Sequence, residues 1–296
     1  MQPQKPFVAA GFMLVATAFI AATTLLAKAL GTDALGPALH PFQVTFGRFV
    51  FAFMAIASVA VFLWPKIERI HLKWHFARTV LGGTGVTLMF AAAALIPLAD
   101  ATALSFLNPV FGMLLAIPLL GERVGPWRWT AAGIALLGAF ILLRPGAGVV
   151  EIGAMLALGA AVVLGLEIIV IKRLSAMERT FQILIINNMI GVVLITGPAS
   201  VVWTWPTPEQ WAALVALGTL MACAQACFIN SVSRAEASFV LPFSYVTLIF
   251  ASFYDGVIFS VWPDDVSVLG ALVIIAGAVL ITWREGLARR RGGSGD

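Results

Sequence analysis

The stretch LADATALSFLNPVFGMLLAIPLLG, residues 98–121, decides the fold, because ASFVLPFSYVTLIFASFYDGVIFS, residues 237–260, aligns with it without a gap. At a constant shift of 139 positions, Phe106 aligns with Tyr245 and Phe111 with Phe250. Each stretch is the fourth of five apolar spans in its half of the chain. Five is an odd number, so the second half must enter the bilayer from the opposite side. The pattern predicts an inverted-topology repeat, the architecture of many proteins that move solutes across membranes.

The composition excludes an ordinary soluble domain. Of the 296 residues, 61% are hydrophobic and 11% are charged, which is more apolar surface than a water-soluble fold can bury. The apolar runs are continuous and about 20 residues long, as helices need to be to cross a ~30 Å hydrocarbon core. We therefore predict an all-α membrane protein with ten transmembrane helices as two inverted five-helix repeats, over residues 9–30, 42–63, 76–96, 100–119, 127–143, 152–171, 181–202, 211–231, 237–260 and 266–283.

The ten spans divide the chain into two units and a tail. Residues 1–146 form the first five-helix repeat, residues 147–286 the second, inverted repeat, and residues 287–296 a disordered cytoplasmic tail. The first span is longer than the apolar core of a signal peptide and lacks a convincing cleavage site, so we expect it to remain.

The basic residues predict the orientation. The net charge of +4 does not indicate a nucleic-acid partner, because these residues cluster in alternate loops. The other loops hold little positive charge beyond Lys28 and Arg144. This asymmetry follows the positive-inside rule and predicts a multi-pass protein of the bacterial inner membrane with both termini in the cytoplasm. The cytoplasmic set is Lys5, Lys66, Arg69, Lys73, Arg78, Arg123, Arg128, Lys172, Arg173, Arg179, Arg234, Arg284, Arg289, Arg290 and Arg291.

No sequence motif indicates an enzyme, a cofactor or a metal site. The sequence has no Walker A loop, dinucleotide fingerprint or HExxH helix, so ATP hydrolysis on this chain does not drive transport. Cys223 and Cys227 lie four positions apart in one span, where we expect them to pack as small apolar residues. We expect His40, His71 and His75 in loops near the membrane interfaces.

Two prolines interrupt spans that are partners in the repeat. Pro109 lies inside the fourth span and Pro242 near the start of the ninth. Each deprives a backbone carbonyl of its donor, so the freed group should face protein or a water-filled cavity. Paired interruptions of this kind point to a transporter's binding site; a kink that serves packing alone is the alternative. We expect these prolines, with Gly82 and Gly83 in the third span, to let the helices move.

Polar and aromatic side chains mark candidate substrate contacts. Stripes of polar residues on one helix face either line a cavity or bond neighbouring helices together, and hydroxyl groups also satisfy themselves on their own helix. We expect a mostly apolar cavity that suits neutral or aromatic amino acids. Its predicted contacts are Thr24, Phe90, Asn108, Asn187, Tyr245 and Ser252.

Few charges lie within the spans, and each needs a partner or a purpose. Arg48 and Asp255 both fall in the outer half of the bilayer, so they either pair as an outer gate or bind a zwitterionic substrate. Glu167 either takes up a proton or caps the inner surface near Lys172. We expect Lys28 to extend its amine to the membrane surface.

Small residues in the fifth and tenth spans predict close helix contacts. Ala131 and Gly138 correspond to Gly270 and Gly277, and residues seven apart share a helix face. Without bulk at these positions, the backbones can approach closely. We expect these spans to form a scaffold, with the protein a monomer or a homodimer through helices five and ten.

The same stretches resemble a known family. ADATALSFLNPVF at 99–111, followed by LGER at 120–123, resembles the fourth span of EamA-type proteins of the drug/metabolite transporter superfamily. ASFVLPFSY at 237–245 and IFSVWPD at 258–264 resemble the ninth. Gly121-Glu122 has the counterpart Ser260-Val261, so we assign Glu122 a structural role. The resemblance implies a ten-helix carrier with a central cavity and rocking halves; many bacterial members export amino acids.

The expected function is secondary-active export of aromatic and neutral amino acids and related small metabolites. Specificity should be broad, because one methylene in an apolar pocket distinguishes substrates by only about 1–3 kcal/mol. Transport would proceed by alternating access as spans three, four, eight and nine open and close. The alternatives are a drug or toxic-cation carrier with an acid at its site, a nucleotide-sugar carrier with a basic pair, and a non-transporting membrane receptor. The expected partners are lipid and a small-molecule substrate, with no cofactor.

Overall fold

The computed structural model describes residues 6–63, 69–108, 110–112, 114–115, 126–143, 152–175, 177–232 and 241–292. These residues form helices and connecting segments, with no strand among them. The α-helices are α1 Pro6–Gly31, α2 Pro41–Leu63, α3 Leu72–Leu95, α4 Leu98–Ser105, α6 Pro126–Leu143, α7 Ile152–Ser175, α8 Thr180–Val201, α9 Pro208–Val232, α11 Val246–Phe259 and α12 Asp265–Gly292. Two short 3-10 helices, η1 Asp33–Leu35 and η2 Leu241–Tyr245, lie between them.

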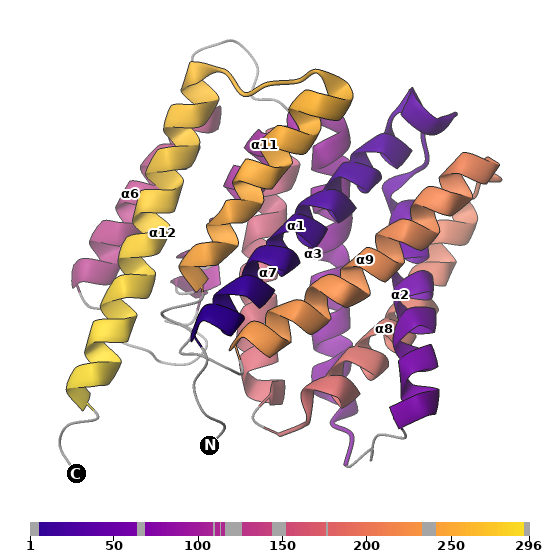
Figure 1. Cartoon of the computed structure of the whole chain (residues 1–296), viewed down its shortest axis with the longest axis horizontal. Helices are drawn as coiled ribbons and strands as arrows, with labels where there is room; N and C mark the ends of the chain where they lie inside the picture. The colour runs from indigo at the N-terminus through magenta and orange to yellow at the C-terminus, as the bar shows by residue number, and fades with distance from the viewer. Residues whose placement is uncertain are drawn as a thin grey trace.

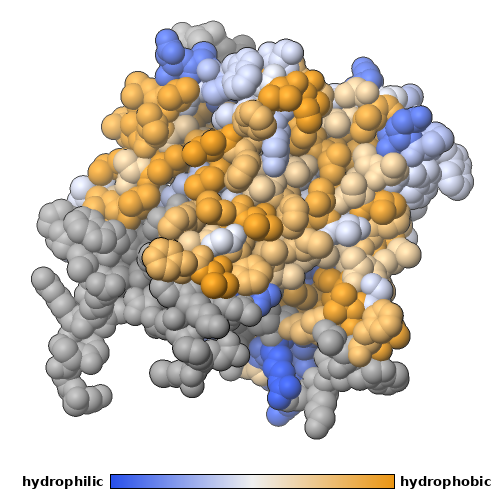
Figure 2. Space-filling view, viewed as in Figure 1, coloured by the Kyte–Doolittle hydropathy of each residue, from blue (hydrophilic) through white to orange (hydrophobic). Residues whose placement is uncertain are grey.

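The outer surface of the helices is suited to lipid. Within the described residues, six helices have the length and apolar composition to cross a membrane, and three shorter ones are apolar. Figure 2 shows a broad hydrophobic face with hydrophilic patches towards its two ends. Many large apolar side chains are exposed on the outside of the helices, including Met54, Val193, Ile249 and Phe253. Their exposure is favourable only where hydrocarbon replaces water as the solvent.

The helices pack so that the two halves interleave. α1, the first helix of the first repeat, packs on α9 and α11 of the second repeat. In the same way α7, the first helix of the second repeat, packs on α3 and α4 of the first. Equivalent helices also meet each other as α2 with α8, α4 with α11 and α6 with α12. Figure 1 shows that α1 begins and α12 ends at the same end of the bundle. This pairing is the one expected of two repeats related by an approximate two-fold axis.

Glycines allow α6 and α12 to touch along their backbones. A Cβ atom at Gly138 would lie 2.6 Å from the Ile274 nitrogen, and one at Gly277 would lie 2.6 Å from the Ala135 nitrogen. The small residues of these two spans therefore do mark a close helix contact, and the structure shows that the spans make it with each other. Because this face is occupied within one chain, a homodimer through these helices would have to use their other faces.

Both predicted helix interruptions lie near breaks in the described helices. α4 ends at Ser105, the residue whose carbonyl is expected to lose its helical donor to Pro109; Pro109 itself lies outside the described residues. Pro242 lies in η2, and the regular helix α11 begins only at Val246. At its other end α11 stops at Phe259, and the next residue, Ser260, has a left-handed φ of 56°, a conformation that favours glycine.

Candidate functional site

A central cavity of about 500 Å³ lies between the two halves of the chain. It is lined by α1, α2 and α3 from the first half and by α7, α8 and α9 from the second, which are the first three helices of each repeat. The lining belongs to the half of the bundle where α3 and α8 begin and α7 and α9 end. Its residues are Ile20, Arg48, Phe49, Arg78, Gly82, Gly83, Val86, Glu167, Ile171, Ile183, Leu184, Asn187, Met221, Ala224, Gln225 and Phe228.

Three charged side chains meet in this mostly apolar cavity. The Arg78 Nε atom lies 3.6 Å from Glu167 Oε1, and Arg78 Nη1 donates to the Ile183 carbonyl at 3.3 Å. Arg48 is buried, and its guanidinium carbon lies 4.6 Å from the centre of the Phe49 ring. The Nε and Nη1 atoms of Arg48 have no hydrogen-bond partner among the described residues. The described lining of the cavity therefore contains two guanidinium groups and one carboxylate.

Glycines make room for the groups that line the cavity. A Cβ at Gly82 would lie 2.7 Å from Glu167 Oε1, so only glycine leaves space for the carboxylate as it stands. A Cβ at Gly83 would touch the Phe49 ring at 3.6 Å, an ordinary van der Waals distance. The two adjacent glycines thus differ: the first is required by the position of Glu167, while the second is tolerant.

The structure brings four of the predicted site residues together. Arg48, Gly82, Gly83 and Asn187 all line the central cavity. The Asn187 side-chain oxygen lies 3.1 Å from the Thr79 hydroxyl, whose single proton the His75 carbonyl can also accept at 2.8 Å.

The remaining predicted contacts lie elsewhere. Thr24 donates to the Ile20 carbonyl of its own helix at 3.1 Å, which is the self-satisfied alternative. Phe90 is buried in an apolar cluster with Leu39, Val44 and Leu214.

The polar positions of the fourth and ninth spans also lie outside the central cavity. Tyr245 packs edge-on against Phe106, with ring centres 5.1 Å apart, so the two aligned positions of the repeat contact each other. The Asn108 carbonyl faces Gly165, where a Cβ would come within 2.8 Å of it.

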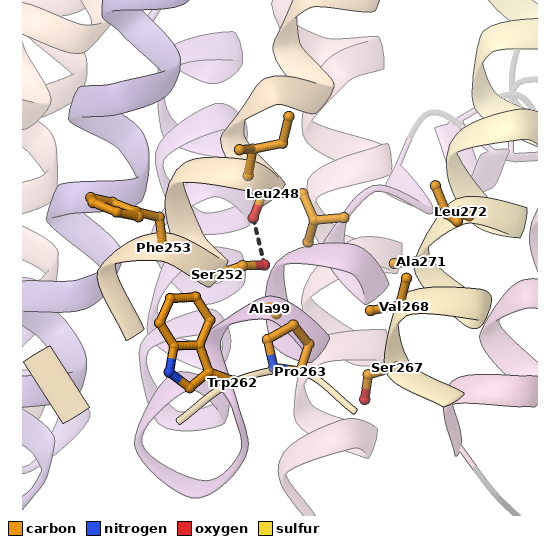
Figure 3. A pocket seen from close by; sticks show the side chains of 11 residues that line it. Ala99, Leu248, Ser252, Phe253, Trp262, Pro263, Ser267, Val268, Ala271 and Leu272 are labelled. Atoms are coloured by element: carbon orange, nitrogen blue, oxygen red, sulfur yellow. Dashed lines mark hydrogen bonds between the residues drawn. The ribbon is translucent and has the colours of Figure 1, made fainter. Parts of the chain in front are cut away.

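Ser252 belongs to a second, apolar cavity of about 380 Å³ between α11 and α12, shown in Figure 3. Its hydroxyl donates to the Leu248 carbonyl of the same helix at 2.9 Å, drawn as the dashed line in Figure 3. Phe253, Trp262 and Leu272, which line this cavity, are more than half exposed. This cavity therefore opens on the lipid-facing surface, and its wall is mostly apolar.

A buried ion pair at the opposite end of the bundle shows that the expectations for Lys28 and Asp255 were wrong. Lys28 does not extend to the membrane surface: its Nζ lies 2.5 Å from Asp255 Oδ1, and the side chains are 10% and 1% exposed. Asp255 pairs with this lysine and not with Arg48. Its other oxygen accepts the Leu98 N–H at 2.8 Å, and Lys28 also lies 5.0 Å from the centre of the Phe259 ring. These contacts join α1, the start of α4 and α11.

Other polar contacts join the two halves at that same end. The Gln43 amide donates to the Thr204 carbonyl at 2.6 Å, and the Gln210 amide donates to the Pro37 carbonyl at 2.8 Å. Gln43 and Gln210 are both buried. The end of the bundle away from the central cavity is thus held closed across the two repeats.

A histidine–carboxylate cluster lies at the end of the bundle nearer the cavity. Glu178, between α7 and α8, accepts hydrogen bonds from the His71 backbone at 2.7 Å, from His75 Nε2 at 2.8 Å and from Gln182 at 2.7 Å. Burial of Glu178 opposes ionisation, but these hydrogen bonds and that of the His71 ring hold its pKa at about 2. His75 is fully buried within α3, so the expectation that it lies in a loop was wrong.

Sequence reasoning missed part of the charged set. Arg78 was counted with the cytoplasmic loops because it lies near the start of a span, yet it is buried in the cavity. The signal was its spacing, since Gly82 lies one turn further along the same helix. Glu167 was considered beside Lys172, whereas the structure places it beside Arg78. In the described part of the chain no three histidine, cysteine or acidic side chains are grouped to hold a metal ion.

Comparisons with known proteins agree with this architecture. The sequence matches the EamA-like transporter family over residues 8–144 and 151–283. It is 25% identical over 276 residues to an S-adenosylmethionine uptake transporter of Rickettsia bellii, covering 93% of each chain. It is 30% identical over 250 residues to a riboflavin transporter of Rhizobium johnstonii, covering 82% of this chain and 81% of that one. A pseudopaline exporter of Pseudomonas aeruginosa is 24% identical over 243 residues, covering 79% of this chain and 84% of the exporter.

A solved crystal structure shows the same fold. It superposes with a TM-score of 0.63 at 22% identity, covering 95% of this chain and 98% of the other. The predicted fold class, ten helices in two inverted repeats of five, is thereby confirmed. The two family matches cover nearly all of the sequence, and the lipid-facing surface agrees with them. The chain therefore belongs to the EamA-like transporter family and is a multi-pass membrane transporter of the drug/metabolite transporter superfamily.

Proposed function

We propose that the protein is a secondary-active carrier that exports aromatic and neutral amino acids and related small metabolites by alternating access. The observation that carries the proposal is the central cavity of about 500 Å³ at the seam between the repeats. Its volume lies within the ~300–1,000 Å³ typical of small-molecule sites. Aromatic and aliphatic side chains such as Phe49, Phe228 and Met221 form most of its wall, which favours a solute with an apolar side chain.

The ends of the bundle support an alternating mechanism. The buried pair of Lys28 and Asp255 closes the end opposite the cavity. With the orientation given by the positive-inside rule, the cavity lies in the cytoplasmic half, both termini are cytoplasmic, and the pair closes the outward side. Exchange would require this pair to separate while the first three helices of each repeat close over the solute. The proposed unit is a monomer, or a homodimer through the outer faces of α6 and α12.

The test is a flux assay on purified protein in proteoliposomes offered a panel of labelled amino acids. Uptake of several neutral and aromatic amino acids is expected, driven by counterflow without ATP. Uptake of one compound alone would contradict the broad specificity. A receptor or an enzyme would leave every gradient unchanged. Epitope tags on the two ends would test the orientation, because tags on opposite membrane faces are incompatible with ten spans.

A second candidate is a carrier of anionic metabolites such as nucleotide-linked sugars. The observation in its favour is that Arg48 and Arg78 both line the cavity, and a nucleotide-sugar site should contain a basic pair. Glu167 beside Arg78 weighs against it, because it neutralises one of the two cations. Adding UDP-glucose to the panel separates the candidates: its uptake, without that of amino acids, would favour the second.

A further inference from the structure

The charges in the central cavity do not balance. Among the described lining residues, Arg48 and Arg78 are the cations and Glu167 is the anion. A charge held at membrane depth costs at least about 2.5–3.5 kcal/mol, so an unneutralised guanidinium is not retained without a use. The excess guanidinium therefore needs an anionic group of a ligand beside it.

Of these two guanidinium groups, Arg78 alone forms an ion pair among the described residues, although its Nε has no hydrogen-bond partner there. Arg78 lies beside Glu167 and donates to the Ile183 carbonyl. The Arg48 guanidinium carbon lies 4.6 Å from the centre of the Phe49 ring, and its Nε and Nη1 atoms have no hydrogen-bond acceptor among the described residues. These unused N–H donors suit a carboxylate, whose oxygens accept charge-assisted hydrogen bonds from a guanidinium.

The cavity also contains a hydrogen-bond acceptor that has no donor. The side-chain oxygen of Gln225, on α9, is buried without a donor in the described part of the chain. Gln225 lines the same cavity as Arg48 and Glu167. An unsatisfied buried acceptor costs about 1–3 kcal/mol, and an ammonium group supplies the N–H donors that it lacks. The cavity thus offers unused donors for an anion and an unused acceptor for a cation.

We propose that Arg48 binds the carboxylate of the transported solute and that Gln225 and Glu167 accept hydrogen bonds from its ammonium group, so that the site recognises an α-amino acid as a zwitterion. This inference rests on the proposed function and names the groups of the same site that select the substrate. Apolar neighbours such as Ile20 and Val86 leave the side chain of the solute weakly specified. Specificity resides in the two charged ends.

The test compares three ligands that differ only at those ends: phenylalanine, phenethylamine, which lacks the carboxylate, and 3-phenylpropionate, which lacks the ammonium group. Binding is measured by calorimetric titration of detergent-purified protein and transport by counterflow in proteoliposomes. The variants are Arg48→Gln, which removes the charge, and Arg48→Lys, which keeps the charge but loses the planar fork. Arg173→Gln is the matched control, because it removes a guanidinium that is exposed and stacks on Trp74 outside the cavity.

Arg48→Gln should weaken phenylalanine and 3-phenylpropionate binding about 10- to 100-fold, the range for a charge-assisted hydrogen bond, and leave phenethylamine binding unchanged. The affinity of Arg48→Lys for phenylalanine and 3-phenylpropionate should lie between those of the wild type and Arg48→Gln. Arg173→Gln should bind all three ligands as the wild type does. The ligand-free melting temperature of Arg48→Gln should not fall, because the variant removes an unpartnered buried charge.

The outcomes separate this inference from the proposed function. Equal losses for phenylalanine and phenethylamine in Arg48→Gln would overturn the carboxylate assignment while leaving amino-acid transport intact. Absence of transport, with carboxylate binding that depends on Arg48, would support the assignment and refute the carrier. If the wild-type protein binds none of the three ligands, or binds phenethylamine as tightly as phenylalanine, the inference is wrong.

Discussion

Replacement of Asp255 by Asn tests the buried ion pair that closes the outer end. The Lys28 and Asp255 side chains are 10% and 1% exposed, so the pair is far from the solvated surface pairs that contribute at most about 1 kcal/mol. Removing one partner leaves the other charge buried and typically costs about 3–5 kcal/mol. Asparagine keeps an oxygen that can accept the Leu98 N–H, so the substitution isolates the loss of charge. We expect the free energy of unfolding to fall by about 3–5 kcal/mol.

The measurement is unfolding in mixed micelles titrated with SDS, for Asp255→Asn, Lys28→Met and the double variant. The double variant should recover most of the loss, because neither charge then remains unpaired. Asp33→Asn is the control: Asp33 is an exposed carboxylate near the same end that accepts the Ala38 N–H at 3.3 Å, and the change in the free energy of unfolding should stay within about 0.5 kcal/mol. A loss of less than about 1 kcal/mol for Asp255→Asn, or additive single variants, would refute the reasoning.

Three further predictions concern the cavity, the scaffold and the cluster at the cavity end. Gly82→Ala should displace the Glu167 carboxylate, slow uptake and lower the free energy of unfolding by about 1–3 kcal/mol. The control is Gly11→Ala, which should change neither uptake nor the free energy of unfolding, because nothing lies within 4 Å of the added Cβ. Gly277→Ala should separate α6 from α12 and cost about 1–3 kcal/mol in the SDS titration; Gly133→Ala, which meets nothing within 4 Å, is its control, and equal effects would contradict the packing. The pKa of Glu178 is lowered to about 2, so its contribution to stability is full above the unfolded carboxyl pKa of about 4.3 and is lost as the pH falls towards 2. Glu178→Gln should therefore flatten the fall in melting temperature below about pH 5, and parallel melting curves for variant and wild type would argue against this assignment.

The sequence alone was sufficient for the membrane architecture. Continuous apolar runs of membrane-spanning length specify helices, because lipid leaves no other way to satisfy the backbone of a single span. The odd number of spans in each half required the inversion. The glycines at 138 and 277 predicted where two helices touch, since only residues without bulk allow that approach, and Pro242 predicted the irregular start of α11.

The site was predicted only in part. Arg48, Gly82, Gly83 and Asn187 line the cavity, but the polar residues of the fourth and ninth spans, such as Asn108 and Tyr245, do not. Hydropathy determines that a helix crosses the bilayer, and says little about how far it is rotated about its own axis.

Tertiary structure decided which charges meet. Lys28 and Asp255 are 227 positions apart, and nothing local to either residue distinguishes a lysine that reaches the surface from one that pairs across the bundle. The same holds for Arg78 and Glu167, which share the cavity only because α3 packs on α7. The rotation of each helix is set by packing against helices distant in the sequence, and that rotation determines which polar side chains face the seam between the repeats and which face lipid.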